Sequence, residues 1–152
     1  MINNQEAKKR SLAKDHYMVA VKLLLRDGDT LLITKDQWGE WDLPGGRIRT
    51  DQFNVPLEDI LEDKVVEELG SDLKYELGEI KTTFRVERKE AGRGGETVRI
   101  FAVGYEAKYL SGEIKLGDHH EKYEWINLKT TDLNDYKTPS GWVAQIENLK
   151  RT

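Results

Sequence analysis

LPGGRIRTDQFNVPLEDILEDKVVEELG, residues 43–70, joins a pair of glycines to a segment with the pattern of an amphipathic helix. Pro56 suits the first turn of that helix, acidic residues at 58 and 59 complement the positive end of its dipole, and Gly70 suits its C-terminal cap. The apolar residues that recur every fourth position are Leu57, Leu61, Val65 and Leu69. This period predicts a helix that buries one stripe against a core.

The polar side of this helix carries a lysine and two adjacent glutamates. One helical turn brings Lys64, Glu67 and Glu68 onto neighbouring positions. On a helical wheel Glu67 lies on the exposed side, whereas Glu68 lies at the border of the apolar stripe, with Lys64 between them. A carboxylate at the edge of a core is costly unless a positive or hydrogen-bonding group meets it. A divalent cation and Lys64 are both candidates for that partner.

The rest of the chain has mostly the pattern of β-strands. Two strands are expected within residues 17–36, on either side of Asp27-Gly28-Asp29, and a short extended segment within residues 40–46. Two more are expected at residues 81–89 and 96–109, joined by a glycine-rich turn, and another at residues 121–128. Residues 138–149 have the pattern of a terminal helix. The fold class is therefore mixed α/β (α+β), with a polar N-terminal arm at residues 1–15 and one domain at residues 16–152.

Composition excludes several classes of protein. The 152 residues carry a net charge of −4, so there is no general basic balance that would favour nucleic acid as a partner. The absence of cysteine excludes disulfides and thiolate metal sites. The polar N-terminus lacks the apolar core of a secretory signal, and the most apolar run, residues 18–25, is too short to span a bilayer. We expect a cytoplasmic protein with no membrane partner.

The stretch at residues 43–70 resembles the Nudix box of the Nudix hydrolases, whose pattern is G-x5-E-x7-R-E-U-x-E-E-x-G-U, with U an aliphatic residue. The matching residues are Gly46, preceded by Leu43-Pro44-Gly45, and then Val65, Glu67, Glu68 and Gly70. The resemblance implies a Nudix-like α/β/α sandwich with a mixed β-sheet and a loop–helix–loop catalytic box. It also implies Mg²⁺ or Mn²⁺ held against a diphosphate, with water attacking phosphorus.

The box departs from the family pattern at several positions. Gln52 stands where the family has its first glutamate, and the spacing to the helix is three residues longer. Asp63 and Lys64 occupy the positions of the family's arginine and third metal-binding glutamate, and Ser71 replaces the last aliphatic residue. A hydrogen bond between Gln52 and Asp63 would preserve the brace of the loop. An ammonium at Lys64 cannot bind a metal and would repel one.

The resemblance also suggests where further ligands would lie. Glu67 and Glu68 are the expected catalytic and metal-binding residues, and Asp118 or Glu121 would supply the missing carboxylate from the loop before the strand at 121–128. His119 is a possible base, but no spacing singles it out, and the alternative for this loop is a polar surface. The expected phosphate- or nucleotide-binding residues are Gly45, Gly46, Arg47, Arg85 and Arg88. The alternative for the arginines is a solvated ribbon with interspersed glutamates. Trp38 and Trp41 either stack a base or pack beside a turn.

Two functions follow from these expectations. The first is a Nudix-type hydrolase of a nucleoside diphosphate linked to another moiety, dependent on Mg²⁺ or Mn²⁺ and weakened by Lys64. The second is a degenerate Nudix-fold module that binds a nucleotide or regulates a partner, with the Lys64 ammonium in place of a metal. The partner in either case is a small-molecule nucleotide or another diphosphate. The sequence leaves the oligomeric state open, with a homodimer as one option.

Overall fold

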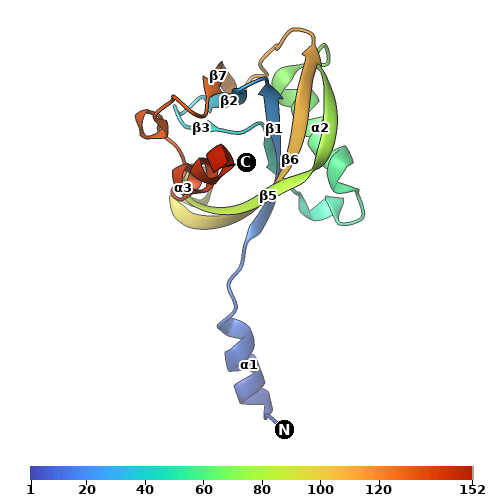
Figure 1. The fold of residues 1–152 in the computed structure, drawn as a ribbon. Helices are drawn as coiled ribbons and strands as arrows, with labels where there is room; N and C mark the ends of the chain where they lie inside the picture. Colours follow the sequence, from blue (N-terminus) through green and yellow to red (C-terminus); the bar gives the residue numbers. More distant parts are fainter. Residues whose placement is uncertain (152) are drawn as a thin grey trace.

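The computed structural model describes residues 1–151, except for the side chains of residues 150 and 151. The helices and strands are α1 (Asn4–Leu12), β1 (Met18–Asp27), β2 (Thr30–Asp36), β3 (Trp41–Asp42), β4 (Gly45–Arg47), α2 (Leu57–Leu69), β5 (Lys74–Glu90), β6 (Glu96–Ser111), β7 (His120–Asn127) and α3 (Trp142–Glu147). Figure 1 shows the strands gathered into one body, with α2 on one side and α3 on the other.

The strands form a mixed sheet around β1. The order of the main path is β3-β2-β1-β6-β5, while β4 pairs with β1 and β7 pairs with β2. β1 runs parallel to β6 from Met18↔Ile100 to Arg26↔Lys108, and its other pairings are antiparallel. Because β1 pairs with β2 only near their connecting turn, its opposite end is free to pair with β4.

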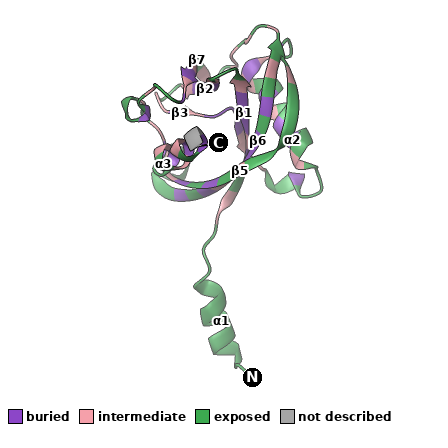
Figure 2. Cartoon of the chain, viewed as in Figure 1, coloured by how far each residue is buried: buried purple, intermediate pink, exposed green. Residues whose placement is uncertain are grey.

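Alternation along β1 divides the interior into two cores. Ala20 and Leu24 face a core that includes Trp142 and Ile146 of α3. The intervening apolar residues of β1 face a second core that includes the apolar stripe of α2. The buried side chains therefore lie on both faces of the sheet, and Figure 2 shows buried positions along β1, α2 and α3. This arrangement confirms the predicted α/β/α sandwich and the mixed α+β class.

Most of the expected elements are confirmed, with two differences. The hairpin at residues 18–36 and the helix after Pro56 lie where the patterns predict them. β5 begins at Lys74, seven residues before the predicted start at 81, because its exposed first part pairs with the end of β6. The terminal helix is shorter than predicted: Ser140 forms a β-bridge with Glu87, which holds the backbone extended until α3 begins at Trp142.

The N-terminal arm contains α1, which projects away from the body of the protein (Figure 1). All nine of its residues are exposed, and the Asn3 side chain caps the helix by accepting a hydrogen bond from the Glu6 N–H. Near the base of the arm, Asp15 pairs with Arg99 of β6. None of the helices in the described residues combines the length and apolarity needed to cross a bilayer.

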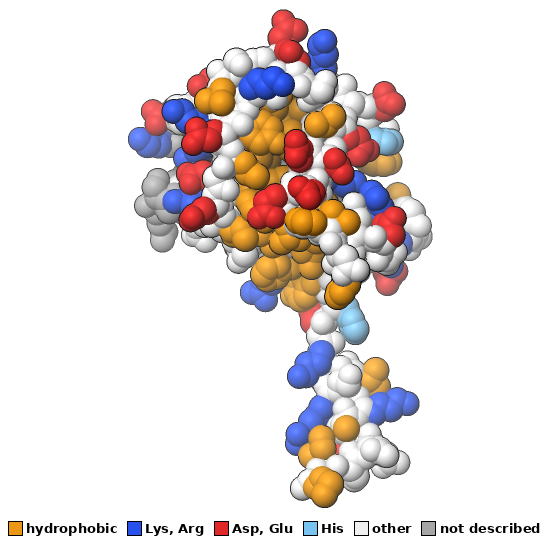
Figure 3. Space-filling view, turned by 90° about the vertical axis from the view of Figure 1, so that its right-hand side faces the viewer, with side chains coloured by type: hydrophobic (Ala, Val, Ile, Leu, Met, Phe, Trp, Pro, Cys, Tyr) orange, Lys and Arg blue, Asp and Glu red, His pale blue; other side chains and the backbone are white. Residues whose placement is uncertain are grey.

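The outer side of α2 borders a shallow groove. Figure 3 shows hydrophobic side chains gathered on this side of the molecule, with acidic side chains among and around them. A cavity of about 490 Å³ here is lined by Val66, Leu73 and Leu77 and bordered by Glu58 and Glu62. Val66 of α2 is thus 47% exposed on this side, whereas Leu61 on the inner side is fully buried.

Leu61→Ala should lower the free energy of unfolding by about 2–5 kcal/mol, because Leu61 is fully buried between α2 and the sheet. Val66→Ala removes a side chain that is 47% exposed on the same helix and should cost less than about 1 kcal/mol. Urea unfolding followed by circular dichroism measures both. An equal loss of unfolding free energy in the two variants would contradict this packing.

Candidate functional site

The loop before α2 is fixed against β1 by a glycine. Gly45 pairs with Lys22 across β4 and β1, and its φ of +138° lies in a region that L side chains rarely adopt. A Cβ at this position would lie 2.0 Å from the Val21 carbonyl oxygen. The Gly45 N–H then donates a 3.0 Å hydrogen bond to Oε2 of Glu68. The glycine therefore ties the sheet to the last turn of α2.

The two glutamates of α2 lie in different environments, as the helical wheel predicts. The Glu67 side chain is 62% exposed, and its Oε2 lies 3.9 Å from the Nζ of Lys64. The Glu68 side chain is 16% exposed and points toward the loop and β7. Within the described residues Lys64 forms an ion pair with Glu67 and none with Glu68. The side-chain carbons of Lys64 pack against Gly46 instead, so that its stem covers the glycine pair.

Glu68 faces a histidine that the sequence did not single out. The Nε2 of His120 lies 3.9 Å from Oε1 of Glu68. Burial raises the pKa of Glu68 to about 7, while the Lys22 ammonium and the Gly45 N–H act in the opposite direction. Burial also lowers the pKa of His120 below its usual 6.5. Glu68 therefore changes protonation state near neutral pH beside a largely uncharged imidazole.

A second polar group missed by the sequence reasoning lies beneath the loop. The Lys22 Nζ lies 3.0 Å from Oδ2 of Asp42 and donates a hydrogen bond to the Leu43 carbonyl oxygen. The other oxygen of Asp42 accepts hydrogen bonds from the Leu43 N–H and from Nε1 of Trp142. Only 12% of the Lys22 side chain is exposed. A single lysine within the apolar run of residues 18–25 was the signal that could have indicated this group.

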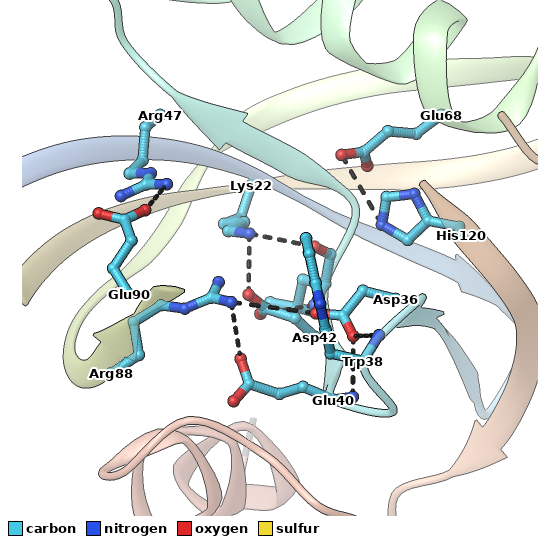
Figure 4. Close-up of polar contacts among 11 residues, drawn as sticks. Lys22, Asp36, Trp38, Glu40, Asp42, Arg47, Glu68, Arg88, Glu90 and His120 are labelled. Carbon is cyan, nitrogen blue, oxygen red and sulfur yellow. Dashed lines mark hydrogen bonds and ion pairs between the residues drawn. The ribbon is translucent and has the colours of Figure 1, made fainter. Parts of the chain in front are cut away.

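Arg88 belongs to a neighbouring ion-pair cluster. Its guanidinium lies 3.4 Å from Glu40 and 3.9 Å from Asp36, and Figure 4 shows these residues beside Asp42 and Lys22. Burial raises the pKa of Glu40 above its usual 4.5, and Arg88 opposes that shift. Arg88 is therefore held close to the candidate site, but already paired with carboxylates.

The other two arginines expected to bind phosphate lie apart from Glu68. Arg47 pairs with Glu90, which also pairs with Arg93 at 3.3 Å. Arg85 is exposed on β5, and no ion pair of its side chain occurs among the described residues. The structure therefore brings Gly45, Gly46 and Lys64 together with the glutamates but does not place Arg47 or Arg85 at them.

The loop before β7 approaches the end of α2 through its backbone. Gly117 donates its N–H to the Glu68 carbonyl oxygen at 3.1 Å, and a Cβ at Gly117 would lie 2.3 Å from the Glu67 carbonyl oxygen. Asp118, the next residue, is exposed in a turn, while Glu121 lies 4.0 Å from Lys35. His120, rather than the expected His119, points inward to Glu68.

The expected brace between Gln52 and Asp63 does not form. Gln52 is buried, and its Oε1 accepts a 2.8 Å hydrogen bond from the Arg49 N–H within its own short helical turn. Asp63 is exposed on α2, and no hydrogen bond or ion pair of its side chain occurs in the part of the chain that is described. Gln52 therefore stabilises the loop locally, because its amide oxygen can cap a backbone N–H without a charged partner.

Two carboxylates of α2 provide the oxygen ligands that Mg²⁺ and Mn²⁺ prefer. Among the described residues, however, no group of three or more His, Cys, Asp or Glu side chains is arranged to hold a metal ion. Mg²⁺ commonly binds through one or two carboxylates together with waters and substrate phosphates. Glu67 and Glu68 fit that mode, but they do not fit an ion enclosed by protein ligands alone.

Three buried side-chain atoms around this site have no hydrogen-bond partner within the described residues. They are Nε of Arg88, Nδ1 of His120 and Oε1 of Glu40, the last of which forms only the 3.4 Å ion pair with Arg88. Buried polar atoms are normally satisfied, and exceptions often lie where a ligand or water would complete the bonding. The three atoms belong to the group of side chains drawn in Figure 4, between the loop, β7 and the start of β3.

Comparisons with known proteins agree on the fold. No family model matches the sequence, and no curated protein is significantly similar to it. Among solved structures, a MutT protein from Methanosarcina mazei Go1 has a TM-score of 0.72 at 23% identity, covering 91% of this chain and 96% of that chain. An ADP-ribose pyrophosphatase from Streptococcus suis has a TM-score of 0.59 at 18% identity over 90% and 94%.

A third solved structure is the Nudix domain of NrtR from Shewanella oneidensis in complex with ADP ribose. It has a TM-score of 0.60 at 17% identity and covers 99% of this chain and 97% of that chain. These likenesses extend over nearly the whole of each chain. At such low identities they show that the arrangement of strands and helices described above is the Nudix fold.

The pH dependence of stability should depend on Glu68. Because its folded-state pKa is about 7 and its usual value is 4.5, the folded protein holds a proton that the unfolded chain releases between these pH values. The free energy of unfolding should therefore fall as pH rises from about 4.5 to about 7. Glu68→Gln should remove this part of the fall, since a glutamine does not titrate.

Urea unfolding at a series of pH values measures this effect. Glu62→Gln is the matched control, because Glu62 is exposed on the same helix and has no role in the site. If the free energy of unfolding changed equally with pH in wild type and Glu68→Gln between pH 4.5 and about 7, the raised pKa of Glu68 would be contradicted.

Proposed function

We propose that this chain, which has the Nudix fold, is a hydrolase that cleaves the diphosphate of a nucleoside diphosphate linked to another moiety. The observation that carries the proposal is the Glu68 carboxylate held against the Gly45 N–H, with Glu67 beside it. A glycine loop that allows close backbone approach, next to paired carboxylates, is suited to a charged diphosphate and a divalent cation.

Glu67 and Glu68 would hold Mg²⁺ or Mn²⁺, with Asp118 as a candidate for a further oxygen ligand. When bound, such an ion neutralises charge on the phosphate oxygens and lowers the pKa of a coordinated water. Asp118 follows Gly117, whose backbone is hydrogen bonded to the end of α2. The remaining ligands would be waters and phosphate oxygens.

The chain's own side chains supply the charge that a diphosphate requires. The Lys64 stem lies on Gly46, so its ammonium is close to where phosphates would approach the loop, and Lys22 lies beneath the same loop. A cation near the bridging oxygen stabilises the negative charge that develops as the phosphoanhydride breaks. In this role Lys64 compensates in part for the carboxylate that it replaces.

A proton acceptor is also present. The oxygen of water forms the new bond to phosphorus, the bridging P–O bond breaks, and one proton from the water must pass to a base. The carboxylate of Glu68, which the Gly45 N–H holds beside Glu67, would accept that proton. His120, 3.9 Å away, can orient the carboxylate.

Hydrolysis of ADP-ribose and of other nucleoside diphosphates linked to a sugar or alcohol, with Mg²⁺ or Mn²⁺ present, tests the proposal. Wild type should release a nucleoside monophosphate, and Glu68→Gln should reduce kcat by at least about 100-fold, the scale of a lost proton acceptor. Glu62→Gln should leave turnover unchanged. Absence of turnover on every substrate would contradict the proposal.

A second function is favoured by one observation: Lys64 forms an ion pair with Glu67, and among the described residues no three acidic or histidine side chains are arranged to hold a metal ion. In this version the protein binds a nucleotide without hydrolysing it, and the ammonium takes the place of a metal. Binding of ADP-ribose without any turnover, and without dependence on divalent metal, would support this alternative.

Lys64→Glu tests whether the Lys64 ammonium lies at the metal site, which both functions require. A third carboxylate in place of the ammonium should tighten Mn²⁺ binding by at least about tenfold, because it removes repulsion and adds a ligand. Calorimetric titration of Mn²⁺ measures the change, and Asp63→Glu serves as the control on the exposed side. Equal Mn²⁺ affinity in wild type and Lys64→Glu would show that Lys64 lies outside the metal site.

A further inference from the structure

A second cavity lies at the other end of the β2–β7 pair from the candidate site. Its volume is about 410 Å³, and it is lined by Asp27, Tyr109, Gly112, Glu113, Ile114, Tyr123 and Trp125. Trp125 is opposite Leu32 in the sheet, whereas His120 is opposite Asp36. The cavity is therefore separated from Glu68 along the strands, and it has no role in the proposed hydrolysis.

Three of the seven residues that line the cavity are aromatic. The rings of Tyr109 and Trp125 meet edge to face, with centroids 5.5 Å apart and an interplanar angle of 71°, so that together they form a corner. Tyr109 is fixed because its hydroxyl donates a 2.7 Å hydrogen bond to the Gly112 carbonyl oxygen. Tyr123, 41% exposed, supplies a third ring that a ligand can reach from solvent.

Two carboxylates border the same cavity without a basic partner. No ion pair of the Asp27 or Glu113 side chain occurs among the described residues, although Asp29, two residues along the hairpin, lies 3.9 Å from Lys129. The position of Glu113 is set by its own N–H, which donates to Oδ2 of Asp72. The cavity therefore combines an aromatic corner with two carboxylates that form no ion pair among the described residues.

We propose that this cavity binds a small organic cation that carries a quaternary ammonium group, such as a choline-type head group. The faces of aromatic rings attract cations, and quaternary ammonium groups are recognised by sets of aromatic side chains of this kind. A quaternary nitrogen has no N–H group, so it loses no hydrogen bonds to water on binding and is less costly to desolvate than a primary ammonium. Asp27 and Glu113 add attraction without requiring a direct hydrogen bond.

The volume agrees with this ligand class. A cavity of about 410 Å³ lies at the small end of the range for small-molecule sites, so it suits a head group with a short attached chain rather than a whole nucleotide. The acidic border also disfavours a phosphate, which Lys22 and Lys64 at the candidate site would attract. The cavity and the candidate site are thus expected to take ligands of opposite charge.

Choline and its neutral isostere, in which a tert-butyl group replaces the trimethylammonium, provide the direct test. Saturation-transfer NMR and calorimetry on the full chain should show choline binding in the millimolar range or tighter. The neutral isostere has the same shape and should bind at least about fivefold more weakly, since it lacks the cation–π attraction. Equal affinity for the two compounds, or no binding of choline, would overturn the proposal.

Substitutions locate the binding within the cavity. Tyr123→Leu should weaken choline binding about threefold to tenfold, whereas Tyr123→Phe should retain it, because the ring face is kept. Asp27→Asn should weaken binding, and Asp29→Asn, the matched control in the same hairpin, should not. The three substituted residues are exposed, so each variant should fold, and circular dichroism checks that it does. Unchanged affinity in both Tyr123→Leu and Asp27→Asn would place any choline binding elsewhere and overturn the assignment.

Discussion

One hydrogen bond, from the backbone N–H of Gly45 to the side-chain carboxylate of Glu68, connects the glycine loop with helix α2. It depends on the absence of a side chain at Gly45, because the strand at this point lies directly against the Val21 carbonyl oxygen. The glycine belongs to the sheet and the glutamate to α2, so the bond sets the distance between them. The loop between Gly46 and α2 is three residues longer than the family pattern. It is stabilised within itself, because the Gln52 side chain accepts a hydrogen bond from the Arg49 N–H.

The same arrangement explains the electrostatics of the site. Glu68 is held where burial disfavours its ionised form, while Lys22 and the Gly45 N–H favour it, and the balance leaves its pKa close to neutral. Lys22 is itself fixed by Asp42, which also binds Trp142 of α3. The terminal helix on the opposite face of the sheet thereby contributes to the position of a charge beneath the loop.

Much of the fold could be predicted from the sequence because its signals are local. The turn at Asp27-Gly28-Asp29 and the helix after Pro56 are marked by residues with specific backbone preferences. The contrast between exposed Glu67 and partly buried Glu68 follows from helical period alone. The first part of β5 escaped prediction because its strand is defined by pairing with β6 rather than by an apolar pattern.

The candidate site was harder to predict, since it depends on contacts between distant segments. His120 rather than His119 faces Glu68, because the β-bulge that follows Lys35 sets the register of β7. The expected bond between Gln52 and Asp63 was wrong because Gln52 is turned into its own loop. Arg88 lies near the candidate site, but its guanidinium forms ion pairs with Glu40 and Asp36. No spacing in the sequence indicates these pairs.

The most direct measurement is hydrolysis of ADP-ribose in ¹⁸O-labelled water with Mg²⁺, followed by ³¹P NMR of the products. If water attacks phosphorus at the site formed by Glu67 and Glu68, one phosphate of the products should carry the isotope shift, and Glu68→Gln should abolish both label and product. Bound but intact ADP-ribose, or a product whose phosphates carry no label, would contradict the account.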